Sequence, residues 1–400
     1  MIPALRKQFN ENFREVAYRH YLEELQAPYP GALDFRVAET PLFISAQFRD
    51  QMLEACEHII DIIIAPNFTQ QSETALPEAY RVPGEENHPQ CLVFDFGICT
   101  SESGGYEPKL IELQGFPSLF GYQAWQEQVI RSIFPIPSNF STYLNGFDSK
   151  TYRQFLKEMI VGNHNPESVV LLEIFPHQQK TRIDFYCTEE YTGISIVCLT
   201  ELEQDGKQLF YKKNGRRIPI TRIYNRIIFD ELQQQSLAVQ EKGKLLFQPL
   251  EVEWVPHPNW FYRISKHTLP FIKHRYVPVT HFLSDCNPLP TDLENYVLKP
   301  LFSFAGQGVI IDVTIADIEK IADKSNWILQ QKVTYADAIE TPDGRAKAEI
   351  RLFYFWKQGA PRPVAVNNLA RLSKGKMIGV RYNKDKEWVG GTLAFFETHE

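Results

Sequence analysis

One lysine and the short loop that follows it are the groups in this sequence best suited to a polyphosphate. Lys299 ends the apolar run 296–299, and the loop 305–308 separates it from a second apolar run, 309–313. Loop N–H groups reach phosphate oxygens most easily where glycine removes the Cβ, and an ammonium group neutralises the charge. An ordinary turn between two strands would show the same pattern. The residues predicted to contact phosphate are Lys299, Gly306, Gln307 and Gly308.

Three side chains with oxygen ligands lie in a predicted hairpin further upstream. The strand-like runs 91–97 and 109–114 flank a turn rich in Ser and Gly. Alternate side chains of a strand point to opposite faces, so an antiparallel pair places Asp95, Glu112 and Gln114 on one face. Mg²⁺ prefers hard oxygen ligands and keeps several waters, so these residues suit a magnesium site that bridges phosphates. A solvated sheet face carries the same alternation, and that interpretation stays open.

The elements that hold these residues are predicted from periodicity and turn residues. Residues 1–90 show helical spacing of apolar positions, and 47–63 is the clearest helix. The apolar runs 169–174 and 194–199 flank a helix that Gly193 ends, a spacing typical of a right-handed parallel crossover. Asn214-Gly215 between two strand-like runs predicts a tight hairpin turn. Further helices are expected at 123–134, 149–160, 180–191, 265–274 (with Ser265 as its cap) and 316–324.

Composition and charge limit the class of protein. The chain has 400 residues, which favours two or three lobes, and its 44% hydrophobic and 23% charged content is ordinary for a globular protein. A net charge of −7 argues against a sequence-independent nucleic-acid binder. The apolar runs are too short to span a bilayer, and the amino end lacks a signal-peptide pattern. Six cysteines in no metal-like spacing predict reduced thiols, so we expect a cytoplasmic protein without nucleic-acid or membrane partners.

Several short motifs, taken in order, resemble the circularly permuted branch of the ATP-grasp family, such as the synthetase domain of glutathionylspermidine synthase. The Lys299 strand with its glycine loop, the hinge-like run 327–333 and the run 349–354 resemble its nucleotide fold. The run 94–96 followed by 109–112 resembles its aspartate followed by a Glu-x-Asn pair. The acids precede the lysines in the chain, and this order is the permuted one.

The resemblance implies further contacts to ATP. The segment 260–266 resembles the stretch that supplies the first nucleotide lysine, here Lys266. The hinge-like run places Gln330 and Gln331 near the adenine, and Lys332 follows it as a third candidate lysine. The cofactors implied are therefore ATP and Mg²⁺.

Two arginines are implied in catalysis by the same resemblance. The stretch ending at Arg371 resembles one whose arginine faces the transferred phosphate. Arg351 is the second candidate, although it is also placed to pair with Glu349 two residues away. The chain departs from the family pattern in two places: Gln114 stands where the asparagine is usual, and Val93 lies where an arginine is expected upstream of the aspartate.

Arg222 and Arg226 are candidates for binding a substrate carboxylate. A guanidinium fork matches the two oxygens of a carboxylate, which makes Arg226 the more attractive of the two. The spacing from Arg226 to Asp230 also suits an ion pair on a helix, so the structural interpretation is equally open.

We therefore expect an α/β (α+β) protein with an ATP-grasp-like, circularly permuted fold. Its predicted units are 1–160, a helical segment plus the metal-ligand half of the core; 161–253, a central strand–helix–strand, pre-ATP-grasp-like unit; and 254–400, the nucleotide-binding half. The resemblance implies a ligase that uses ATP and Mg²⁺ to join a small-molecule carboxylate to an amine through an acyl phosphate. A catalytically inactive nucleotide-binding protein and a small-molecule kinase are the alternatives. The sequence names neither the substrates nor the oligomeric state.

Overall fold

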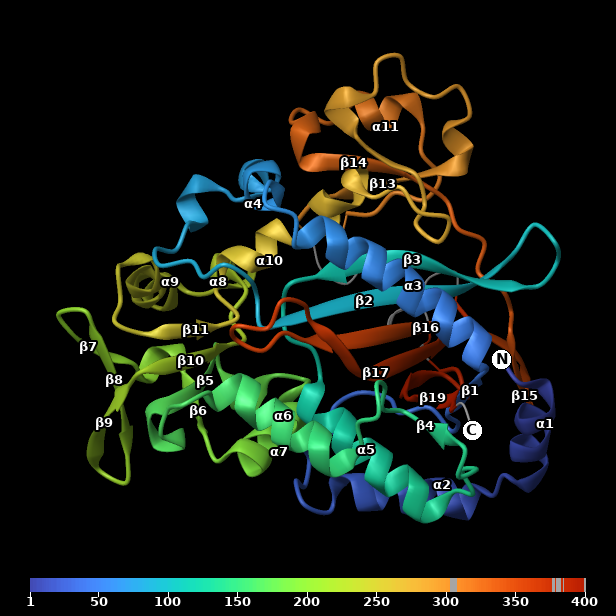
Figure 1. Cartoon of the computed structure of the whole chain (residues 1–400), viewed down its shortest axis with the longest axis horizontal. Coiled ribbons are helices and arrows are strands. Elements are labelled where there is room, and N and C mark those ends of the chain that lie inside the picture. Colours follow the sequence, from blue (N-terminus) through green and yellow to red (C-terminus); the bar gives the residue numbers. More distant parts are fainter. Residues whose placement is uncertain (303–307, 376–377, 379–382, 384, 399–400) are drawn as a thin grey trace.

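The structure, a computed structural model, describes residues 1–302, 308–375, 378, 383 and 385–398. This part of the chain is a mixed α/β protein built around a six-stranded antiparallel sheet (Figure 1). Strands from the first third of the chain pair there with strands from the last fifth. In sheet order they are β18 (Gly390–Thr392), β17 (Val364–Ser373), β16 (Gly344–Phe355), β2 (Cys91–Thr100) and β3 (Tyr106–Gln114), and β15 (Ile339–Thr341) pairs with β16.

The predicted hairpin and the helix that packs on it are both confirmed. β2 pairs antiparallel with β3, and Asp95 lies opposite Glu112. One face of the sheet is apolar and carries Phe94 and Phe96, which belong to a buried cluster with residues of α3 (Ala46–Ile63). α3 crosses this apolar face (Figure 1). The opposite face of the same strands carries the charged residues, because successive side chains alternate.

A four-stranded parallel sheet confirms the predicted crossover. β5 and β6 are parallel neighbours joined through α7 (Arg182–Thr192). Gly193 ends α7 with φ of 80°, a backbone conformation that favours glycine. Phe120 of α5 and Leu156 of α6 share a buried cluster with residues of this sheet. The sheet order is β11 (Glu253–Val255), β10 (Arg222–Asn225), β5 (Val169–Glu173) and β6 (Ser195–Cys198), and the two helices are α5 (Phe120–Ile133) and α6 (Ser149–Val161).

A third, antiparallel sheet forms what we call the small lobe, at the top of Figure 1. Its order is β12 (Thr280–Phe282), β14 (Trp327–Gln331) and β13 (Tyr296–Pro300), and α11 (Ile315–Glu319) belongs to it. The strand expected at 309–313 is absent from the described residues: only Ile310 bridges to Leu298. The helix expected at 316–324 is shorter, because it ends at Glu319.

The segment that enters the small lobe differs from its prediction. Instead of a helix at 265–274, there is α10 (Asn259–Arg263) followed by a 3₁₀ segment, η7 (Lys266–Phe271). Ser265 does cap it, since its side chain accepts a hydrogen bond from the His267 N–H. Pro270 lies inside η7 and has no N–H to donate, which disfavours a continuous α-helix.

The remaining elements lie around these three sheets. The predicted Asn214-Gly215 turn is confirmed, with φ of 50° and 77°, and joins β8 to β9. All six cysteines are free thiols. Among the described residues, no helix is long and apolar enough to cross a bilayer. The other elements are α1 (Pro3–Asn12), α2 (Glu15–Gln26), β1 (Leu42–Ile44), α4 (Phe68–Gln71), β4 (Phe140–Ser141), β7 (Glu203–Asp205), β8 (Gln208–Lys213), β9 (Arg216–Ile220), α8 (Phe229–Leu232), α9 (Leu237–Gly243) and β19 (Ala394–Glu397).

Candidate functional site

Five charged residues share one face of the six-stranded sheet, which we call the charged face. Their positions follow from the strand register, because residues opposite each other in neighbouring strands point to the same side. Asp95 lies opposite both Glu112 on β3 and Arg351 on β16. Glu349, two residues before Arg351, lies opposite Arg371 on β17. The charged face therefore crosses four strands.

Asp95 is held by two arginines from the neighbouring strands. Arg351 Nε and Nη2 donate to Oδ1 and Oδ2 of Asp95 at 2.6 Å each, and Arg371 Nη2 donates to Oδ2 at 3.2 Å. Burial alone would raise the pKa of Asp95, but the charge and hydrogen bonds of Arg351, with the charge of Arg371, hold it below its ordinary value. Asp95 anchors guanidinium groups here, so a role as a metal ligand would require these contacts to change.

Glu349 is a second carboxylate that contacts Arg371. Arg371 Nη2 donates to Glu349 Oε2 at 2.8 Å, and the Tyr335 hydroxyl donates to Oε1. Burial raises the pKa of Glu349, against the opposing effect of Arg371. The sequence left open an ion pair between Arg351 and Glu349, but the partner of Arg351 is Asp95. Arg371 is 36% exposed, whereas Arg351 is 17% exposed, so Arg371 is the more accessible guanidinium.

A glycine lets the lysine-bearing segment approach the end of β3. The Gly115 N–H donates to the Ile264 carbonyl at 2.9 Å. A Cβ on Gly115 would lie 2.7 Å from the Trp260 carbonyl oxygen, so any larger residue would push α10 away. This contact places η7, and with it Lys266, beside the acidic hairpin.

Lys266 and Glu112 meet at that junction. Lys266 Nζ lies 3.6 Å from Glu112 Oε1 and donates to the Leu301 carbonyl at 3.4 Å. Lys266 is buried, whereas the Glu112 side chain is 29% exposed. Gln114 follows on the same face, opposite Val93, and is half-buried. Residues from the first and the last thirds of the chain thus come together around Glu112.

Lys299 joins the small lobe to the same place. Lys299 and Gln330 are diagonal neighbours on one face of the small-lobe sheet, and Lys299 Nζ donates to Gln330 Oε1 at 2.6 Å. Gln330 Nε2 in turn donates to the Thr280 hydroxyl at 3.1 Å. Lys299 Nζ also lies 3.5 Å from the Ile111 carbonyl, next to Glu112. Burial lowers the pKa of Lys299 to about 8, although Glu112 acts to raise it.

The other residues predicted to contact the nucleotide differ in burial and in the partners of their side chains. Gln330 is buried and its side chain already has two partners, whereas Gln331 is exposed. Lys332 Nζ lies 3.4 Å from Asp312 Oδ1 on the small lobe. Gly308 has φ of 75°, a conformation suited to glycine, and lies against Pro300. Gly306 and Gln307 lie outside the described residues.

Arg222 has a structural environment. Its Nε and Nη2 donate to the carbonyls of Ile160 and Met159 at 2.9 and 3.1 Å, and Nη1 donates to Glu253. All three nitrogens therefore tie β10 to α6 and β11. These contacts leave Arg222 poorly placed for the substrate role that we predicted.

Arg226 lies closer to the charged face. Its Nη1 donates to the Ser118 carbonyl at 2.9 Å, and Arg351 Nη1 donates to the Ser118 hydroxyl at 3.2 Å. Its charged neighbours include Asp184, Glu173 and Glu231, whereas the charge that acts on Asp230 is that of Lys266. Burial raises the pKa of Asp184 to about 6 and that of Glu173 to about 8. The buried Nε of Arg226 has no hydrogen-bond partner among the described residues.

The acids are too dispersed to form a metal cage of their own. In the described ranges, no group of three or more His, Cys, Asp or Glu side chains could hold a metal ion. Mg²⁺ often needs only one or two carboxylates, with substrate phosphates and water completing its shell. Glu112 and Gln114 fit that requirement, and Asp95 does not while two arginines hold it.

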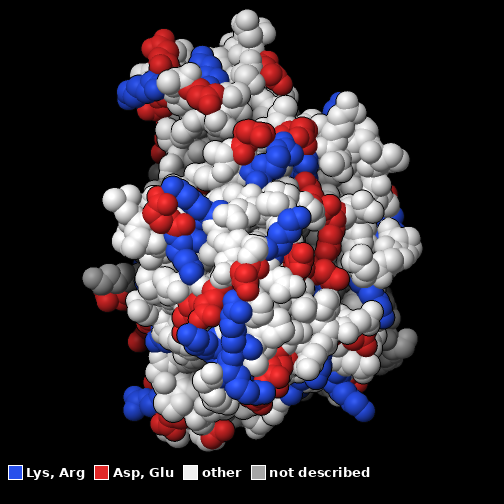
Figure 2. All heavy atoms as spheres, turned by 90° about the vertical axis from the view of Figure 1, so that its left-hand side faces the viewer, with Lys and Arg blue, Asp and Glu red and all other residues white. Residues whose placement is uncertain are grey.

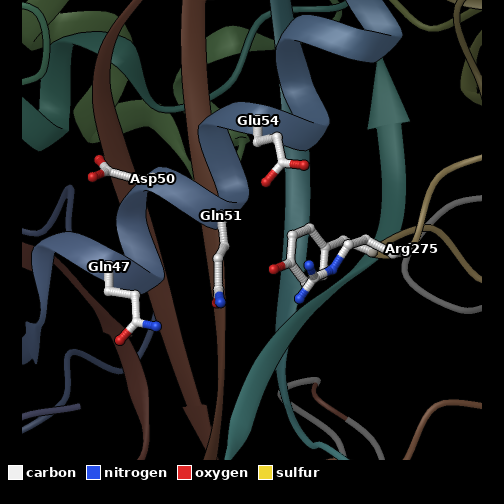
Figure 3. Close-up of a pocket in the computed structure, with 6 residues that line it drawn as sticks. Gln47, Asp50, Gln51, Glu54 and Arg275 are labelled. Carbon is white, nitrogen blue, oxygen red and sulfur yellow. The ribbon is translucent and has the colours of Figure 1, made fainter.

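A surface hollow of about 620 Å³ lies elsewhere, between α3 and Arg275. Gln51 and Glu54 extend from α3 on the side of Arg275, whereas Asp50 points away (Figure 3). None of the described site residues lines it. On the face shown in Figure 2, basic and acidic side chains are interspersed and form no broad area of one sign.

Sequence reasoning missed Thr280, Ser118 and Tyr335. Thr280 supports Gln330, Ser118 links Arg226 to Arg351, and Tyr335 contacts Glu349. The contacts span 14 residues for Tyr335, 50 for Thr280 and 108 for Ser118 with Arg226. A single sequence carries no local signal for such contacts.

The comparisons with known proteins concern the fold. No family model matches the sequence, and no curated protein matches it. A solved structure described as a glutathione synthetase-like effector from Globodera pallida, in its apo form, superposes with a TM-score of 0.58 at 10% identity. The match covers 96% of this chain and 97% of that chain. The chain therefore shares a mixed α/β fold over nearly its whole length with this structure, and the fold is compatible with an ATP-grasp-like architecture.

Proposed function

We propose that this chain is an ATP- and Mg²⁺-dependent ligase that activates a carboxylate as an acyl phosphate and joins it to an amine. The observation that carries the proposal is the meeting of Glu112 with Lys266 and Lys299 beside the charged face. The shared fold with a protein described as glutathione synthetase-like supports it. A fold alone does not assign an activity, so the proposal depends mainly on the residues of the site.

The lysines and arginines would act through charge. Phosphoryl transfer depends mainly on positioning and on neutralising the oxygens of the transferred group. Lys266 and Lys299, which contact Glu112 and Gln330 in this structure, would bind phosphate oxygens, and Arg371 is the more accessible guanidinium on the charged face. Arg351 acts indirectly, because it holds Asp95, which also contacts Arg371.

Glu112 and Gln114 are the residues that would hold Mg²⁺. When bound, the ion would reduce the negative charge that builds up on the phosphate oxygens during transfer. Lys266, 3.6 Å from Glu112, would exchange this carboxylate for a phosphate oxygen when nucleotide binds. On this proposal, Glu112 would hold Lys266 near the phosphate position before nucleotide binds.

Arg226 is the proposed contact for the substrate carboxylate. It is buried, its Nε has no hydrogen-bond partner among the described residues, and Ser118 connects it to Arg351. A carboxylate bound there would lie near the charged face. A guanidinium with an unsatisfied N–H is suited to a second acceptor oxygen.

A nucleotide-binding protein without turnover is the second candidate. The occupation of both Asp95 oxygens by Arg351 favours it, because it removes one carboxylate from a metal site. One experiment distinguishes the ligase from the inactive protein. The protein is incubated with ATP, Mg²⁺, a panel of small carboxylates and hydroxylamine. A ligase forms ADP and a hydroxamate, because hydroxylamine traps the acyl phosphate. ATP binding without ADP formation would support the inactive protein, and ADP formation without hydroxamate would support a kinase.

A further inference from the structure

The hydroxyl of Tyr335 lies between the small lobe and the catalytic arginine candidate. Tyr335 is four residues beyond the end of β14, the strand that carries Gln330. Its hydroxyl donates to Glu349 Oε1, and Glu349 Oε2 accepts from Arg371. Tyr335 itself contacts none of the predicted phosphate ligands through any described hydrogen bond. It reaches Arg371 only through Glu349.

The backbone around Tyr335 is docked against β2. The Ala336 N–H donates to the Ile98 carbonyl at 2.9 Å, and the Thr100 N–H donates to the Thr334 carbonyl at 3.0 Å. These bonds extend the sheet beyond Gly97, where the pairing of β2 with β16 ends. The segment that leaves the small lobe is therefore fixed to the sheet that carries Asp95.

A glycine makes room for the ring. A Cβ on Gly97 would lie 2.7 Å from Tyr335 Cε1 and 3.3 Å from Cδ1. Gly97 is opposite Glu349 in the sheet, so the ring packs over the strand next to the carboxylate that its hydroxyl contacts. The ring is held by packing, and the hydroxyl adds a directed contact that packing does not require.

We infer that Tyr335 is a positioning residue: through Glu349 it sets the orientation of Arg371, and it links that arginine to the segment leaving the small lobe. The role in turnover rests on the proposed function. The effect on Arg371 does not, because it is a property of the protein without substrates.

The chemical reactivity of Arg371 tests the inference directly. The full-length protein is treated with phenylglyoxal, and the modification rate of each arginine is followed by mass spectrometry. In Tyr335→Phe, which keeps the ring, we expect the rate at Arg371 to rise at least threefold. The exposed Arg345 should not change, and Tyr106→Phe, at an exposed tyrosine of β3, should leave Arg371 unchanged. An unchanged rate at Arg371 in Tyr335→Phe would overturn the inference, as would an equal rise at Arg345.

Two further measurements separate this inference from the proposed function. Glu349→Gln should raise the rate at Arg371 at least as much as Tyr335→Phe does, because Arg371 contacts Glu349 directly. An unchanged rate in Glu349→Gln would overturn the inference even if Tyr335→Phe does not fold, because Tyr335 reaches Arg371 only through Glu349. If the protein turns over, Tyr335→Phe should lower kcat about tenfold with an unchanged Kd for ATP, and it should have no added effect in an Arg371→Lys background. Additive effects would contradict the positioning role. No turnover in the wild-type protein would reject the proposed function. The positioning role of Tyr335 would then be decided by the modification rates at Arg371 alone.

Discussion

Arg351 on β16 donates hydrogen bonds to both carboxylate oxygens of Asp95 on β2, with two donor–acceptor distances of 2.6 Å. The two residues are opposite each other in the sheet, so the contact is built into the strand register. An arginine was expected on the same strand as Asp95, where Val93 stands. The neighbouring strand supplies a guanidinium to Asp95 instead. Asp95 and Arg351 are 256 residues apart in the sequence.

Removing the charge of Asp95 should destabilise the fold. Asp95→Asn leaves Arg351 and Arg371 without their shared carboxylate, and breaking a buried ion pair from one side costs about 3 kcal/mol or more. Urea unfolding measures the change in the free energy of unfolding. Asp205→Asn, at an exposed aspartate, should change it by less than about 0.5 kcal/mol. Equal effects of the two substitutions would show that Asp95 is not an anchor.

Glu112→Gln should abolish turnover while the fold stays intact. The substitution keeps the size of the side chain but removes the charge that Lys266 faces and that Mg²⁺ would bind. We expect ADP formation to fall by about 100-fold or more. Glu107→Gln, on the same strand and paired with Lys109, is the matched control and should keep its activity. Unchanged ADP formation in Glu112→Gln would count against the ligase.

Nucleotide binding should depend on pH through Lys299. Its pKa of about 8 means that the ammonium form is lost in the free protein as pH rises above 8, whereas a polyphosphate favours that form. The Kd for ATP should therefore rise above pH 8, and binding at pH 8.5 should take up protons. Calorimetry in buffers of different ionisation enthalpy measures the uptake.

A change at Gln330 provides the control for that titration. Gln330→Glu places a carboxylate next to the Lys299 ammonium, where the present distance is 2.6 Å. The pKa of Lys299 should rise, so the break in the Kd profile should move to higher pH. A profile that stays flat in the wild-type protein, or a break that does not move in the variant, would exclude Lys299 as the titrating group.

The two candidate substrate arginines should respond differently to the same change. Arg222→Lys loses hydrogen bonds to α6 and should lower the free energy of unfolding by about 1–3 kcal/mol without changing the KM for the carboxylate substrate. Arg226→Lys should raise that KM about tenfold, a loss of about 1.4 kcal/mol, because lysine cannot form a fork. The opposite pattern would assign the substrate to Arg222.

Local patterns predicted the elements that local interactions form. The hairpin of β2 and β3, the Asn214-Gly215 turn and the helix ended by Gly193 all follow from alternation or from residues that tolerate positive φ. The facing of Asp95 and Glu112 is a consequence of that hairpin, so it was predictable too. The contacts that these side chains make could not be predicted from the sequence. Arg351 and Arg371 reach Asp95 from strands more than 250 residues away, and only the folded sheet reveals that pairing.

The wrong predictions have physical causes as well. The apolar run 309–313 was expected to be a strand, but only Ile310 bridges to β13. Ile310 and Val313 belong to the hydrophobic cluster of the small lobe, so the run is apolar because it packs there and not because it pairs with a neighbouring strand. The helix expected at 265–274 contains Pro270, and the chain adopts a 3₁₀ segment there. Lys266 is the first residue of this segment, and its Nζ lies 3.6 Å from Glu112 Oε1 near the end of β3.

The order of strands in the central sheet has a consequence for synthesis. β2 lies between β3 and β16, so one of its two edges has no partner until residues near 355 have been made. The nascent chain must carry an apolar strand with an open edge through most of translation, and such edges promote association with other chains. Pairings across this much sequence also slow folding. Fragments that stop before β16 should aggregate on expression, and the intact chain should refold slowly from denaturant.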